Sequence, residues 1–138
     1  MLSKIKYHIP LGFLLIAIFI ESSFPSDFYP KIDFELSDKI VHLLIYFLLY
    51  CCFYYSFINQ DKFDNIKKFA LLYSLLFTAF YGASDEIHQY FVPNRSCDFY
   101  DWLADFSGAM VALIFISVLI KFYEPFKRLN LRKNDSPE

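Results

Sequence analysis

The chain has 138 residues, of which 57% are hydrophobic and 22% aromatic, and its formal net charge at pH 7 is -2. A soluble domain of this size normally carries fewer apolar residues and more charge, and a net charge near zero gives no reason to expect nucleic-acid binding. The apolar residues fall into four blocks separated by polar segments, which is typical of a helical membrane protein.

We expect these blocks to form membrane-spanning helices over residues 7–24, 40–58, 67–90 and 102–123. The first block is as short as the apolar core of a signal peptide, but no small-residue cleavage site follows it, so we interpret it as a retained span. The second block can cross a hydrocarbon core of about 30 Å at ~1.5 Å per residue. Strands are excluded because the alternation of a membrane barrel is absent.

The basic residues predict the orientation of the helices. Of the 13 lysines and arginines, only Lys31, Lys39 and Arg95 lie in the first and third connections. The others lie before the first block, between the second and third, and at the end of the fourth block and beyond it. The positive-inside rule therefore places both termini in the cytoplasm. We predict an all-α, integral membrane four-helix bundle that forms a single domain over residues 1–138, with residues 124–138 as a cytoplasmic tail.

The extracytoplasmic ends of the second and third helices carry ionisable side chains. Asp38 and His42 are four residues apart and share one helical face, with Tyr46 one turn further along. On the third helix, Asp85 and Gln89 form an i,i+4 pair, and Glu86 and Gln89 form an i,i+3 pair. Polar groups near a bilayer normally turn inward, so we expect these faces to meet.

The fourth helix supplies a third polar face at the same depth. Asp98, Asp101 and Asp105 follow the spacing i, i+3, i+7, and the first of them can cap the helix. We expect Lys39 and Arg95 to neutralise part of these carboxylates. The sequence thus predicts an outward-facing polar pocket between three helices.

Small residues on the fourth helix favour close packing. Ala104, Gly108 and Ala112 recur every four residues, and such a stripe lets a neighbouring helix approach closely.

The motifs "DKIVHLLIY" and "SDEIHQYFVPNRSCDFYDWLADFSG" resemble those of the VanZ-like membrane family, over roughly residues 38–108. Asp105 stands where that family usually has Asn. The resemblance implies a small multi-span membrane protein. It also implies a link to tolerance of the glycopeptide teicoplanin, which is associated with the family's namesake, but it implies no particular reaction.

Several chemical roles remain open for the pocket residues. His42 can accept a proton or pin helices together, and Arg95 can clasp a phosphate or pair with Asp98 or Asp101. No ligand spacing specifies a metal, so we expect neither a metal nor a cofactor. No serine or cysteine lies in a nucleophile motif, and the three cysteines are interpreted as structural.

Three functional hypotheses follow. The first is a protein that binds or modulates a membrane lipid, through an anionic head group or a cell-wall precursor. The second is a membrane enzyme in which His42 and a carboxylate of Glu86 or Asp101 perform acid-base chemistry. The third is a scaffold whose polar residues only hold helices together.

Overall fold

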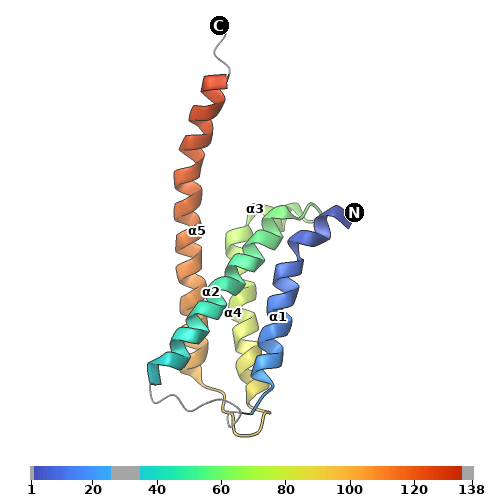
Figure 1. The fold of residues 1–138 in the computed structure, drawn as a ribbon, viewed down its shortest axis with the longest axis vertical. Helices are drawn as coiled ribbons and strands as arrows, with labels where there is room; N and C mark the ends of the chain where they lie inside the picture. Colours follow the sequence, from blue (N-terminus) through green and yellow to red (C-terminus); the bar gives the residue numbers. More distant parts are fainter. Residues whose placement is uncertain (1, 26–34, 135–138) are drawn as a thin grey trace.

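The computed structural model describes residues 2–25 and 35–134, and the side chains of residues 4–25 and 38–123. Every regular element in those ranges is helical, which confirms the predicted all-α class (Figure 1). The elements are the 3-10 helix η1 (Leu2–Tyr7) and the α-helices α1 (Ile9–Ser22), α2 (Glu35–Asn59), α3 (Asp64–Lys68), α4 (Ala70–Gln89) and α5 (Phe99–Asn134).

The long helices overlap the four expected spans but end at different residues. α2 begins at Glu35 rather than near residue 40, and α5 continues to Asn134, so most of the expected tail is helical. An apolar block marks only the part of a helix that suits lipid, whereas backbone hydrogen bonds continue through polar residues. Lys31 and residues 135–138 lie outside the described residues.

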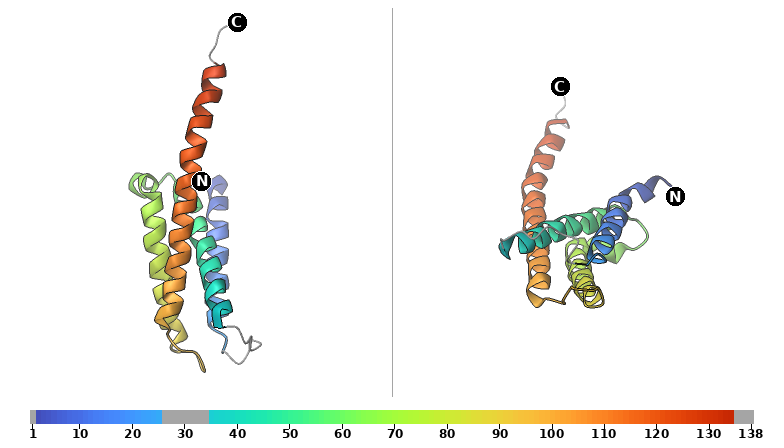
Figure 2. Two further views of the ribbon diagram at one scale, coloured as in Figure 1. Left: turned by 90° about the vertical axis from the view of Figure 1, so that its left-hand side faces the viewer. Right: turned by 60° about the horizontal axis from the view of Figure 1, so that its bottom comes forward.

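The helices α2, α4 and α5 pack against one another, and α1 packs on α2 and α4. α2 runs obliquely across the structure, from the base of α5 towards η1 (Figures 1 and 2). One end of the molecule holds η1 and α3. The other end holds the starts of α2 and α5 and the ends of α1 and α4.

The distribution of side chains suits a protein surrounded by lipid. Two helical segments, Asp38–Asn59 and Phe99–Tyr123, are long and apolar enough to cross a membrane, and α1 is apolar but shorter. Large apolar side chains point outward, and Phe80 is 73% exposed. The interior holds small and polar side chains such as Ser74 and Thr78, beside larger ones such as Tyr46 and Leu49. In an apolar solvent, packing of small residues and hydrogen bonds between helices contribute to helix association.

The backbones of α5 and α2 come into close contact at Gly108 of α5. A Cβ atom added there would collide with the backbone carbonyl of Leu43 in α2. Ala109 and Ala112 beside it are fully buried. The absence of a side chain at Gly108 therefore sets the distance between α2 and α5.

We predict that Gly108→Ala destabilises the protein by about 1–3 kcal/mol, because the backbone of α2 must move to admit the methyl group. Gly12→Ala in α1 is the matched control, since no atom lies within 4 Å of its added Cβ. That control should leave the protein equally stable or raise its stability by up to about 1 kcal/mol through helix propensity. Unfolding in detergent measures both, and equal midpoints for the two variants would contradict the proposed contact.

Candidate functional site

The start of α2, the end of α4 and the start of α5 lie at the same end of the molecule (Figure 1). Polar side chains from these three helices contact one another there. Asp98 joins two of these helices. Its backbone N–H donates to Glu86 Oε2 at 2.9 Å, and its side-chain Oδ1 accepts the backbone N–H of Tyr100 at 2.8 Å. The start of α5 is thereby capped and tied to the end of α4. We call the following residues the polar cluster: Asp38, Lys39, His42, Tyr46, Asp85, Glu86, Gln89, Arg95, Asp98, Asp101 and Asp105.

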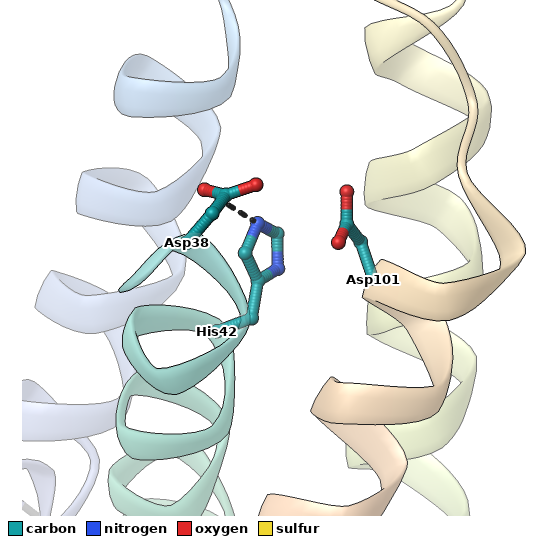
Figure 3. Close-up of side chains that lie close together, drawn as sticks. All are labelled: Asp38, His42 and Asp101. Atoms are coloured by element: carbon teal, nitrogen blue, oxygen red, sulfur yellow. Dashed lines mark ion pairs between the residues drawn. The ribbon is translucent and has the colours of Figure 1, made fainter. Parts of the chain in front are cut away.

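His42 and Asp105 form the centre of the polar cluster. His42 Nδ1 lies 2.9 Å from Asp105 Oδ1, and the Asp105 side chain is fully buried. On its outer side, His42 Nε2 lies 4.0 Å from Asp38 Oδ1. Figure 3 shows the imidazole ring between the carboxylates of Asp38 and Asp101. The histidine therefore has one buried acidic neighbour, Asp105, and two nearer the surface, Asp38 and Asp101.

Three buried oxygen atoms in the polar cluster make no hydrogen bond with any described residue: Glu86 Oε1, Asp105 Oδ2 and the Tyr46 hydroxyl. The three side chains are at most 3% exposed. Because Gly82 has no side chain, Asp105 and Tyr46 can pack closely against its backbone. An added Cβ would lie only 3.0 Å from Asp105 Oδ2 and 3.1 Å from the Tyr46 ring. Buried polar atoms almost always have a partner, so these oxygens call for an explanation.

The lysine at this end pairs as expected. Lys39 Nζ lies 2.5 Å from Asp101 Oδ1 and 3.7 Å from Asp98 Oδ2. It therefore neutralises the rim of the polar cluster, and its side chain stays 39% exposed.

Arg95 has different partners from those expected. Its Nη2 donates to Glu21 Oε1 at 3.1 Å, its Nε to the Phe24 carbonyl at 2.9 Å and its Nη1 to Gln89 Oε1 at 3.2 Å. Arg95 thus links the connection after α4 to the end of α1. The expected pairing of Arg95 with Asp98 or Asp101 is not among the contacts described.

The structure also brings in residues that the sequence patterns did not assign to the pocket. Asp85 is 6% exposed and accepts a 3.1 Å hydrogen bond from Gln89 Nε2. Its i,i+4 spacing from Gln89 was the available signal. Glu21 carried no such signal, because its partner lies in a different segment. Of the small residues expected on α5, Gly108 and Ala112 are buried and Ala104 is half-buried.

The chemistry open to the polar cluster is that of carboxylates around one histidine. A histidine held by a carboxylate can move a proton, and both groups can bind a cation. Two sets of donors each lie within 4.8 Å of one another: Asp38, His42 and Asp101 at the surface, and His42, Glu86 and Asp105 inside.

Fold and site together define a helical protein with two helices that could cross a membrane and a buried acidic cluster at one end. The chain belongs to the VanZ/LLP1 family, whose pattern matches residues 2–121. This match confirms the family resemblance read from the motifs.

A curated relative is an uncharacterized protein, C11E3.10, from Schizosaccharomyces pombe. The two are 28% identical over 88 residues, which cover 63% of this chain and 51% of the relative, so the match spans about half of that relative's length. No solved structure matches the chain.

We predict that Arg95→Gln destabilises the protein by about 1.5–3 kcal/mol, the range for hydrogen bonds to charged groups. Hydrogen exchange should rise at the end of α1, where Arg95 bonds to Glu21 and Phe24. Arg95→Lys is the control for charge. It should recover only part of the lost stability, because an ammonium group cannot replace the planar set of N–H donors of a guanidinium group. Unchanged exchange in α1 would show that these contacts do not hold the helix.

Proposed function

We propose that this chain is a multi-pass protein of the cytoplasmic membrane, with both termini in the cytoplasm and the polar cluster at the extracytoplasmic face. There it binds the headgroup of an envelope lipid or of a lipid-linked cell-wall precursor. Teicoplanin tolerance, which the family resemblance suggests, would follow if the bound headgroup belongs to such a precursor.

The observation that carries this proposal is a buried polar cluster whose inner oxygens make no hydrogen bond with any residue that the structure describes. A scaffold would be expected to satisfy its buried groups internally, because an unmade hydrogen bond costs about 1–3 kcal/mol. The rim of the polar cluster is open to solvent, since the side chain of Asp38 is 68% exposed. Both features favour a ligand over a purely structural role.

Lys39 is the residue best suited to hold a phosphate. Its ammonium group pairs with Asp101 and Asp98, but the side chain stays 39% exposed at the rim. The side chain of Arg95 is 13% exposed and is engaged by Glu21, Phe24 and Gln89. The carboxylates around Lys39 also attract cations, so a headgroup with both phosphate and cationic groups would complement this surface.

Orientation can be tested on the native cysteines. Cys97 is exposed in the connection between α4 and α5, whereas Cys51 and Cys52 are half-buried in α2. A membrane-impermeant thiol reagent should therefore label Cys97 in intact cells and should not label a Cys97→Ser variant.

In that Cys97→Ser background, Asn65→Cys in α3 places a thiol at the opposite end of the molecule. It should react only after the cells are opened. The reverse pattern, with Asn65→Cys labelled from outside and Cys97 protected, would invert the proposed orientation.

The amount of lipid retained by the purified protein tests the proposed headgroup binding. Lys39→Gln should lower the affinity for the co-purified headgroup by about tenfold to one-hundredfold, because a charge-assisted hydrogen bond is lost. Mass spectrometry of lipids retained by the purified protein measures this loss. Lys67→Gln is the matched control, because Lys67 also pairs with an aspartate, Asp61, but at the other end of the molecule. Equal lipid retention by both variants would remove the role of Lys39.

The contact between His42 and Asp105 supports a second candidate, a membrane enzyme acting on the same headgroup. A carboxylate that orients a histidine is a recurring arrangement for general acid-base catalysis. The lipid profiles separate the two candidates. An enzyme would produce a chemically altered lipid that disappears with His42→Ala, whereas a binding protein would change only the amounts retained.

A further inference from the structure

The inner donor set of the polar cluster comes from three different helices. His42 belongs to α2, Glu86 to α4 and Asp105 to α5. One donor atom from each lies within 4.8 Å of the other two. Since no two of these residues are near in sequence, no motif spacing could reveal the set, and the expectation of no metal rested on spacing alone.

Two carboxylate oxygens of this donor set have no hydrogen bond from a described residue that would compete with an ion. Glu86 Oε1 and Asp105 Oδ2 are buried and make no hydrogen bond with any described residue. The other oxygen of each carboxylate is occupied, by the backbone N–H of Asp98 for Glu86 and by His42 for Asp105. One oxygen of each carboxylate thus holds the side chain in place, and the second oxygen can bind an ion.

The surrounding charge favours a cation. Asp85, Glu86 and Asp105 are all buried at this end. Within the side chains that the structure describes, the lysine and the arginine nearby contact other groups, Lys39 at Asp101 and Arg95 at Glu21. Buried charges are normally paired or bound to a metal, and a divalent ion would supply the balancing charge.

From this geometry we propose that His42, Glu86 and Asp105 bind a divalent metal ion. One imidazole and two carboxylates, with no thiolate, suit a first-row transition metal such as Mn²⁺ or Zn²⁺. An ion bound through His42 Nδ1 would take the place of the proton that this nitrogen shares with Asp105 Oδ1, since a ligating imidazole nitrogen must be deprotonated. Nε2 then stays directed to Asp38, which lies 4.0 Å away and can orient the ring as an outer carboxylate. Three protein donors leave coordination positions for water or a ligand oxygen.

The metal proposal and the headgroup proposal share the orphaned oxygens, but they are tested separately, because metal binding needs no lipid and lipid retention is tested at Lys39. In the presence of a lipid, the bound ion would add a positive charge that a phosphate could contact. Failure of lipid retention would therefore leave the metal site untouched, and absence of the metal would leave lipid binding through Lys39 to be judged on its own measurement.

The test is a titration of the purified full-length chain in detergent with Mn²⁺ alone, followed by electron paramagnetic resonance. We expect one tightly bound ion per chain and a higher thermal midpoint with metal. Zn²⁺ should displace the Mn²⁺, and Mg²⁺ should compete poorly. The near-isosteric variants Glu86→Gln and Asp105→Asn should each lower the affinity by about 100-fold or more, beyond the loss seen for outer-shell partners.

Asp85→Asn is the matched control, because Asp85 is also buried and adjacent to Glu86 but lies outside the donor set. It should keep one ion per chain. Nitrogen coupling to the bound Mn²⁺ gives a readout on the parent protein that does not depend on carboxylate variants folding. The coupling should persist in His88→Gln and vanish in His42→Gln.

Two results would overturn the proposal. The first is Mn²⁺ binding that Glu86→Gln and Asp105→Asn leave unchanged. The second is a parent protein that binds no Mn²⁺ and whose thermal midpoint is unaffected by it.

Discussion

The contact between Gly108 and the backbone of Leu43 controls the geometry of this protein. Because α5 presents no side chain there, α2 can approach until backbone meets backbone. His42 precedes Leu43 and Asp105 lies one turn before Gly108, so the same approach brings their side chains within 2.9 Å of each other. A wider separation of the two helices would leave a buried carboxylate far from its histidine. The polar cluster therefore depends on a glycine that takes no part in its chemistry.

The two basic residues at this end, Lys39 and Arg95, both pair with carboxylates of the protein. Arg95 ties α1 to the end of α4, and Lys39 compensates the acidic start of α5. The carboxylates outnumber them, and Asp105 is one of these carboxylates. Its side chain is fully buried, so it places an ionisable group at the least solvated point of the polar cluster.

The sequence predicted the parts of this site that depend on local periodicity. The i,i+4 spacing of Asp38 and His42 and the i,i+7 spacing of Asp98 and Asp105 place side chains on one face of a single helix. Contacts between helices were harder to predict from the sequence. The partners of Arg95 include Glu21, which is 74 residues away and carries no pattern that marks it. The orphaned oxygen of Glu86 depends on the exact position of three helices, which no spacing in one helix reports. The sequence analysis underestimated the length of α5, because the share of apolar residues falls before the helix ends at Asn134.

The shortness of α1 has a consequence for the lipid around it. Its 14 residues rise only about 21 Å, against a hydrocarbon thickness of about 30 Å. Its ends hold polar contacts, from His8 to Ser56 at one end and from Glu21 to Arg95 at the other. In the proposed membrane arrangement this hydrophobic mismatch would thin the bilayer beside α1. Lipid headgroups of the outer leaflet would then sink towards Glu21 and Arg95, which would bring them level with the polar cluster without any motion of the protein.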